Sequence, residues 1–138
     1  MRFNRSKSGV FLASVLFAAS TAGAWADAIE NLQGAWVTED TECTGVFEKT
    51  GGKIRFKDRT FASGDGFIIL GKKVTGPISG CTISQVEQKD GGFSAFLACS
   101  DALVARNFSM KFRVIDPTHF ERLDPDHDVT ITYKKCAL

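Results

Sequence analysis

Several segments that would point to a specific chemistry are missing from this 138-residue sequence. It contains no Gly-x-Ser-x-Gly segment, no glycine-rich phosphate loop and no His-Glu-x-x-His segment, which excludes the usual signatures of a hydrolase nucleophile, a P-loop and a metalloprotease helix. The two histidines, His119 and His127, stand in no pattern that pairs them with a nucleophile and an orienting acid. The sequence therefore predicts no catalytic residue, no cofactor and a protein that is not an enzyme.

An apolar run long enough to cross a bilayer is also missing. The run Val10–Ala19 is too short to span, follows a positively charged start, and precedes the small-residue segment Ala24-Trp25-Ala26. This order predicts a signal peptide over residues 1–26, with cleavage after Ala24 or an uncleaved anchor as alternatives. The first 42 residues contain no cysteine that would accept a lipid. We expect residues 27–138 to form a single domain that is periplasmic or secreted, soluble, and without a transmembrane segment.

Positive charge is not in excess. The chain has 17 Lys and Arg against 16 Asp and Glu, and loss of residues 1–26 removes three basic residues and no acidic one, so 14 basic residues remain against 16 acidic ones. The mature formal charge is therefore 14 − 16 = −2. Binding of nucleic acid through bulk charge needs a basic excess, and we expect no nucleic-acid partner.

No metal-binding pattern accompanies the four cysteines, because the sequence has no Cys-x-x-Cys pair and no histidine at ligand spacing from them. An even cysteine count behind an export signal predicts disulfides, and four cysteines allow three connectivities. Segments 81–88 and 92–99 flank Lys89-Asp90-Gly91, which predicts a hairpin with a three-residue turn. Counting outward from that turn places Cys81 opposite Cys99, and Cys43 then pairs with Cys136 across the two ends of the domain.

Short strands separated by turns dominate the mature chain. Residues 53–57 and 108–114 alternate strictly between polar and apolar side chains, as strands with one buried face do. The other predicted strands are Gly34–Val37, Val46–Lys49, Phe67–Leu70, Lys73–Thr75, Cys81–Gln88, Gly92–Cys99, His119–Leu123 and Val129–Lys134. Residues 27–33 predict a short helical turn before Gly34. Successive hairpins predict an all-β fold, a small antiparallel up-and-down β-barrel of about eight strands, with a β-sandwich as the alternative.

The first predicted strand contains Gly34-Ala35-Trp36, and this Gly-x-Trp resembles the first strand of calycin-type barrels, which include lipocalin-like proteins and small secreted bacterial protease inhibitors. The resemblance also covers the signal-peptide and four-cysteine layout, but no later lipocalin motif. It implies that Trp36 closes one end of the barrel interior and that Gly34 lets neighbouring chain approach. The other interpretation of Trp36 is a buried core aromatic with no part in binding.

Charged residues supply three candidate sites. Lys53, Arg55 and Lys57 fall on one face of a predicted strand and form a basic stripe that fits an anionic partner, although a solvated outer face explains it equally well. Residues 124–128 resemble the opening of a calcium loop, but Val129 and Lys135 stand where an EF-hand needs Gly and Glu, so an acidic turn is favoured. An acid–base pair among Glu39, Asp40 and Glu42 competes with an exposed acidic loop, which is the favoured interpretation.

Twelve phenylalanines against a single tyrosine indicate packing more than binding. We expect the interior to be lined by Phe56, Phe93, Phe108 and Phe112, and a small barrel filled by such rings has no room for a sizeable ligand. The favoured function is then a non-enzymatic binding or inhibitor module that acts on another protein. A carrier of a small apolar ligand is the alternative and needs an unfilled interior next to Trp36. An enzyme or metal protein would need acidic residues or histidines to converge in space.

Overall fold

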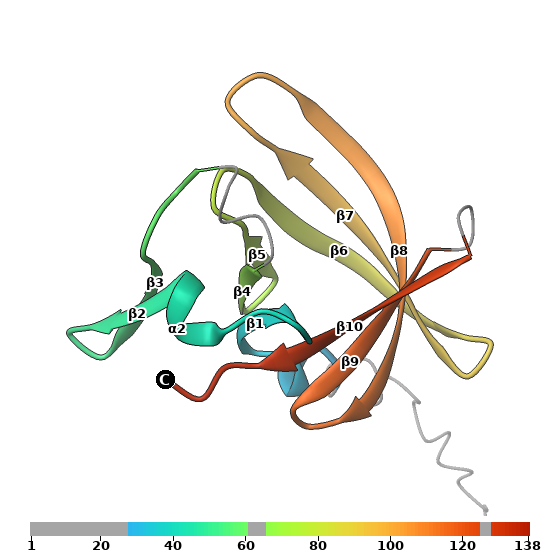
Figure 1. Cartoon of the computed structure of the whole chain (residues 1–138). Helices are drawn as coiled ribbons and strands as arrows, with labels where there is room; N and C mark the ends of the chain where they lie inside the picture. The colour runs from blue at the N-terminus through green and yellow to red at the C-terminus, as the bar shows by residue number, and fades with distance from the viewer. Residues whose placement is uncertain (1–27, 61–65, 125–127) are drawn as a thin grey trace, which may run out of the picture.

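The computed structural model describes residues 28–60, 66–124 and 128–138. The predicted signal peptide and residues 125–127 of the acidic turn lie outside the described residues. Eight antiparallel strands close into one barrel (Figure 1). They are β1 (Gly34–Thr38), β4 (Gly66–Leu70), β5 (Lys73–Thr75), β6 (Gly80–Lys89), β7 (Gly92–Ser100), β8 (Ala105–Asp116), β9 (His119–Asp124) and β10 (Val129–Lys135). Each strand pairs with the next one in this list and β10 pairs with β1, so the predicted up-and-down barrel is confirmed and the sandwich is wrong.

A small unit is inserted between β1 and β4. It consists of the helical turn α2 (Cys43–Val46) and the strands β2 (Phe47–Thr50) and β3 (Lys53–Phe56), which form a two-stranded sheet of their own. We call residues 43–56 the covering unit, because it packs against the outer face of the barrel at β1 (Figure 1). The expectation that these two strands belong to the barrel meander is wrong. Their alternation has another cause. Ile54 and Phe56 pack against the outer wall of the barrel, and the charged side chains that alternate with them face solvent.

Strand β1 is consequently buried on both faces. Trp36 belongs to the core inside the barrel, Ala35 and Val37 belong to the core under the covering unit, and all three side chains are 0% exposed. The close approach of the covering unit requires glycine at position 66 on β4. A Cβ atom there would lie 2.8 Å from Cγ1 of Val46 and 3.0 Å from Cζ of Phe47. The covering unit therefore buries the outer face of β1.

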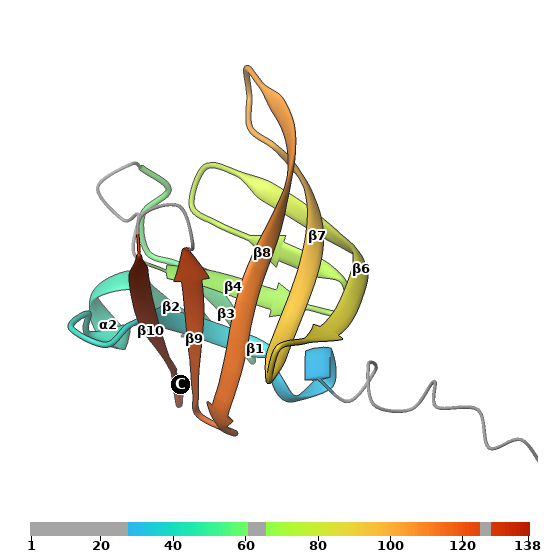
Figure 2. The same ribbon diagram turned by 90° about the vertical axis from the view of Figure 1, so that its right-hand side faces the viewer.

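One end of the barrel is closed by the helical turn over residues 28–31, which lies opposite the β7–β8 connection (Figures 1 and 2). The Trp36 indole Nε1 donates a hydrogen bond to the Leu32 carbonyl over 2.7 Å. Gly34 has a φ of +123°, and a Cβ atom there would lie 2.9 Å from Cε of Lys135, whose Nζ sits 5.6 Å from the Trp36 ring centroid. Gly34 thus lets the Lys135 side chain pass over Trp36.

Two disulfides are present and both have the predicted partners. The end-to-end disulfide joins Cys43 to Cys136 across a sequence separation of 93, and ties the covering unit to the chain after β10. The hairpin disulfide joins Cys81 to Cys99 on the paired strands β6 and β7. The first disulfide therefore attaches the covering unit covalently to the segment after β10, and the second cross-links β6 to β7.

The route to the hairpin pairing differs from the expected one. Lys89 pairs with Gly92, so the turn has two residues, Asp90 and Gly91, with φ values of 51° and 75°. Positive φ at both positions is typical of the two-residue type I′ turn, which needs Asp-Gly or Asn-Gly. This turn shifts the register by one residue, and a β-bulge between Ile83 and Gln85 shifts it back, so that Cys81 still faces Cys99.

Candidate ligand-binding site in the barrel

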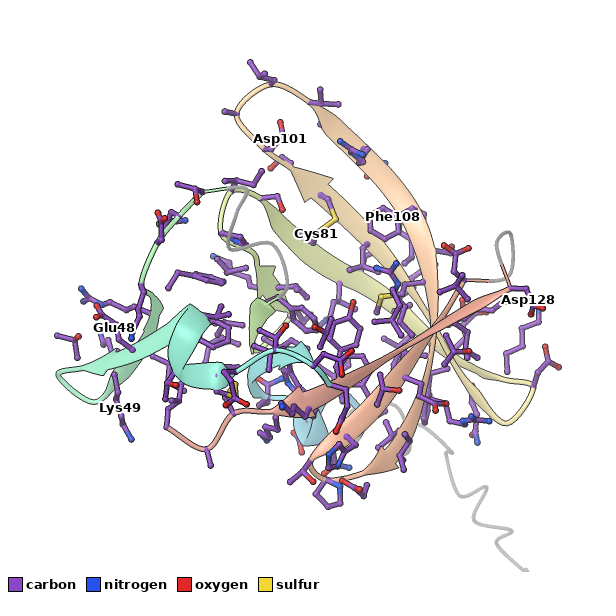
Figure 3. All side chains as sticks on the ribbon, in the orientation of Figure 1. Glu48, Lys49, Cys81, Asp101, Phe108 and Asp128 are labelled. Carbon is purple, nitrogen blue, oxygen red and sulfur yellow. A yellow bond between two sulfur atoms is a disulfide. The ribbon has the colours of Figure 1, made fainter. Side chains whose placement is uncertain are left out.

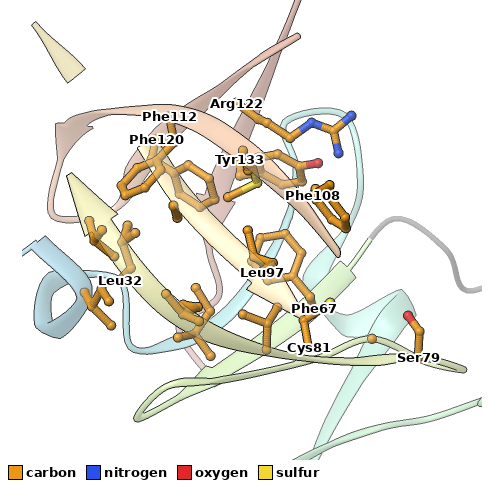
Figure 4. Close-up of a pocket in the computed structure, with 18 of the residues that line it drawn as sticks. Leu32, Phe67, Ser79, Cys81, Leu97, Phe108, Phe112, Phe120, Arg122 and Tyr133 are labelled. Carbon is orange, nitrogen blue, oxygen red and sulfur yellow. The ribbon is translucent and has the colours of Figure 1, made fainter. Parts of the chain in front are cut away.

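The barrel interior holds a cavity of about 290 Å³. The interior is therefore not completely filled by its side chains. Its walls come from the strands β4 to β10 and from the helical turn at the closed end, and nearly all of them are apolar (Figure 4). The lining side chains include Ile29, Leu32, Phe67, Ile69, Val74, Cys81, Ile83, Val86, Ala95, Leu97, Phe108, Met110, Phe112, Phe120, Arg122 and Tyr133.

The cavity stays open because the phenylalanines are distributed differently from the expectation. Phe112 is 2% exposed and stacks on Phe93 with ring centroids 5.3 Å apart, so these two rings pack in the barrel core as predicted. Phe56 lies outside the barrel, where it packs on Phe47 in the covering unit. Phe108 lines the cavity but is 42% exposed. Small side chains such as Ala95 occupy inward positions and leave the space between the rings.

Arg122 is the one charged residue among the described cavity-lining side chains. Strand alternation places it on the same face of β9 as Phe120, and its cross-strand neighbours are Phe112 on β8 and Ile131 on β10. None of the ion pairs within the described part of the chain includes Arg122. Figure 4 shows its guanidinium on the same side of the cavity as the Tyr133 hydroxyl and the Phe108 ring, away from Leu32 at the closed end.

A second hollow of about 310 Å³ adjoins the cavity beside the β7–β8 connection, which contributes Asp101 and Val104 to its walls. Both spaces are lined by Ser79, Cys81 and Phe108, so the exposed Phe108 ring stands between the interior and the outside (Figure 3). The walls of the second hollow also carry Asp101 and Arg106, whose charged groups are 3.9 Å apart. The open end of the cavity is therefore the end near Phe108.

The basic stripe lies on the covering unit and its continuation, away from the cavity. Its three residues are exposed, and Arg55 is paired across the hairpin with Glu48. Arg59, which extends the row in sequence, turns away to donate a hydrogen bond from Nε to the Pro77 carbonyl over 3.2 Å. A binding role for the stripe stays a prediction.

The acidic residues and His119 meet only in part. The His119 ring nitrogens lie 3.0 Å from Asp116 Oδ2 and 4.0 Å from Glu39 Oε2, whereas Asp40 and Glu42 are exposed without joining them. Hydrogen bonds from the side chain and backbone of Thr118 lower the pKa of Asp116 to about 2. Within residues 28–60, 66–124 and 128–138, no group of three or more His, Cys, Asp or Glu side chains is arranged to hold a metal ion.

Arg122 and Tyr133 line the cavity and were not predicted from the sequence to do so. Their signal was available in the alternation of two predicted strands, since Phe120 and Arg122 share one face of residues 119–124, and Ile131 and Tyr133 share one face of residues 129–135. A basic residue on an apolar face is the feature that marks such a position.

A closed eight-stranded antiparallel barrel with two disulfides and an internal apolar cavity is consistent with a calycin-like architecture. Comparison with models of protein families, with curated proteins and with solved structures finds no match for this chain. Of the described residues, none forms a helix long and apolar enough to cross a membrane.

Proposed function

We propose that this protein is a non-enzymatic binding protein that holds a small apolar ligand inside its barrel. The observation that carries the proposal is the cavity of about 290 Å³ with its almost entirely apolar lining. This volume lies near the lower end of the range for ligand pockets, roughly 300–1,000 Å³. At about 30 Å³ for each non-hydrogen atom, the value for liquid water, the cavity has room for roughly ten such atoms.

The cost of keeping this space open supports a ligand. Apolar side chains that face such a space lack the dispersion contacts of a close-packed core, and this loss lowers the stability of the fold. An apolar ligand of matching size offsets that loss, because it restores the missing contacts with Val86, Leu97 and Met110 on the cavity walls.

The expected place of action is outside the cytoplasm. The protein has two disulfides, and disulfides form and persist in oxidising compartments. Together with the signal-peptide pattern and the Gly-x-Trp segment, they support a periplasmic or secreted lipocalin-like carrier.

The test uses the neutral fluorescent probe 1-naphthylamine, whose size matches the roughly ten non-hydrogen atoms that the cavity holds, titrated into the mature, disulfide-bonded protein. We expect a saturable rise in probe fluorescence that added 1-decanol reverses. Ala95 lines the cavity, and Ala95→Leu should weaken probe binding at least tenfold because the larger side chain occupies the site. Ala98 is exposed on the same strand, so Ala98→Leu is the matched control and should bind as the parent does. Equal binding by both variants would show that the probe sits elsewhere.

A second candidate, a module that binds or inhibits another protein, rests on the β7–β8 hairpin, which extends beyond the rest of the barrel (Figures 1 and 2). Its connection exposes 92% of Leu103 and 51% of Val104. Backbone N–H groups of both residues donate to Asp101 Oδ1 over 2.8 Å, which holds the connection in one shape and lowers the pKa of Asp101.

Inhibition assays against secreted serine and metalloproteases test this candidate. Any inhibition should be lost in Leu103→Asp and kept in Leu70→Asp, a matched change at a leucine that is 76% exposed at the end of β4. Inhibition lost equally in both variants would mean that the β7–β8 hairpin is not the contact.

A further inference from the structure

We infer that the ligand of the barrel is a single-chain amphiphile of about ten carbons with one compact anionic head group, and that Arg122 binds this head group. The inference rests on the proposed function and deepens it, since it adds a charge requirement to an apolar site. It is drawn from the position of one cation among the cavity walls.

Arg122 is half-buried in an apolar wall and joins none of the ion pairs among the described residues. Its neighbours in register, Phe112 and Ile131, are hydrophobic, and no Asp or Glu is found among the described residues that line the cavity. A charge in apolar surroundings is unfavourable unless it is paired or reaches water. A guanidinium offers a planar set of donors that matches the two oxygens of a carboxylate, so an anionic head group supplies the pairing that the protein does not.

The polar end and the apolar end of the cavity lie on opposite sides. Arg122 reaches the side where Phe108 and Ser79 form the boundary with the second hollow, while Leu32 lies at the other side (Figure 4). A ligand that enters past Phe108 therefore inserts its tail toward Leu32 and leaves its head beside Arg122. The Tyr133 hydroxyl lies on the same side and adds a polar group near that head.

The cavity volume sets the tail length. With about 290 Å³ available and about 30 Å³ for each atom, roughly ten carbon atoms fit when the head group stays at the open end.

Asp124, two residues beyond Arg122 on β9, already has a contact of its own and is absent from the lining. The described cavity wall thus carries one positive charge, which selects anions over cations.

The experiment compares ligands that share one tail and differ in the head group. Displacement of 1-naphthylamine from the mature protein is measured with decanoate, decyl phosphate, 1-decanol and decyltrimethylammonium. We expect the two anions to bind about tenfold to a hundredfold more tightly than 1-decanol, the range that corresponds to a charge-assisted hydrogen bond, and the cation to bind more weakly than 1-decanol. The order of decanoate and decyl phosphate identifies a carboxylate or a phosphate head group as the source.

Substitutions then assign the preference to one residue. Arg122→Gln should remove the advantage of the anions while 1-decanol affinity changes less than about twofold, and Arg122→Lys should keep part of it. Arg113→Gln, on the outer face beside Glu121, and Arg106→Gln, in the second hollow, are the matched controls and should behave as the parent. Unfolding midpoints confirm that each variant is folded, and the head-group series on the parent protein stands even if Arg122→Gln does not fold.

Two outcomes would overturn the inference. Equal affinity for decanoate and 1-decanol in the parent protein would show that no charge is recognised, while the apolar site itself would stand. Loss of the anion preference in Arg106→Gln but not in Arg122→Gln would move the head group to the second hollow. If neither the probe nor any ligand of the series binds, the proposed function fails together with the inference.

Discussion

Replacing Ala95 by leucine should stabilise the folded protein, although the same change blocks the proposed site. Ala95 is 2% exposed and lies in register with Val86 on β6 and Met110 on β8, both of which also line the cavity. In a filled barrel a larger side chain at this position would be forced against its neighbours, at a cost of about 1–3 kcal/mol. In an open barrel it enters empty space.

Two estimates of the gain agree. Leucine adds three carbons, each worth about 0.8 kcal/mol when it is removed from water, and loses about 0.5–1 kcal/mol of side-chain entropy, which leaves a gain of about 1.5 kcal/mol. The same three atoms fill roughly 90 Å³ of the cavity, and at about 24 cal/mol for each Å³ the gain is about 2 kcal/mol. We therefore expect the free energy of unfolding to rise by about 1–2 kcal/mol and the Tm to rise by about 5–10 °C.

Urea unfolding followed by Trp36 fluorescence measures this change, because Trp36 is the one tryptophan in residues 27–138. Ala98→Leu, on the outward face of the same strand, should change the free energy of unfolding by less than about 0.5 kcal/mol. An unchanged m-value would confirm that the denatured state is not involved. A loss of 1 kcal/mol or more in Ala95→Leu would refute the reasoning, since it would mean that the barrel has no usable space.

Four further predictions concern the disulfides, Trp36, Asp116 and the basic stripe. Replacing both cysteines of one disulfide by alanine should lower the free energy of unfolding by about 4–5 kcal/mol for the end-to-end disulfide and by about 3 kcal/mol for the hairpin disulfide, because a longer closed loop restricts the unfolded chain more. Denaturant midpoints in the reverse order would contradict this. Trp36→Phe leaves the Leu32 carbonyl without its donor and should lower stability by about 1–3 kcal/mol by circular dichroism, whereas an unchanged midpoint would mean that the indole bond does not matter. Asp116 has a folded pKa of about 2 against an ordinary value of 3.8, so its carboxylate stabilises the fold above pH 3.8 and this contribution is lost as the pH falls toward 2. Asp116→Asn should therefore have a lower urea midpoint than the parent at pH 7 and the same midpoint near pH 2. Changing the whole basic stripe to glutamine should leave the Tm nearly unaltered, and its functional interpretation fails if the parent protein does not bind anionic vesicles at low salt.

The strands and both disulfide partners could be predicted from the sequence because they depend on local signals. Alternation with a period of two, turn residues and hairpin counting act over a few residues, and they located every barrel strand to within a few positions. The hairpin disulfide shows how far such counting extends. The turn was predicted one residue too long, and the pairing still held because the β-bulge near Ser84 restores the register.

Tertiary structure alone decided which apolar face meets which surface. The alternation of residues 53–57 shows that Ile54 and Phe56 are covered, yet it is the same whether the cover is the barrel interior or, as here, the outer wall at Ala35 and Val37. The volume inside a closed barrel likewise depends on all of the inward side chains together. Phe56 packs outside the barrel and Ala95 is small, so space remains inside that no single segment of the sequence reveals. The alternation of β9 indicates that Arg122 shares a face with Phe120, and closure of the sheet decides that this face lines the cavity.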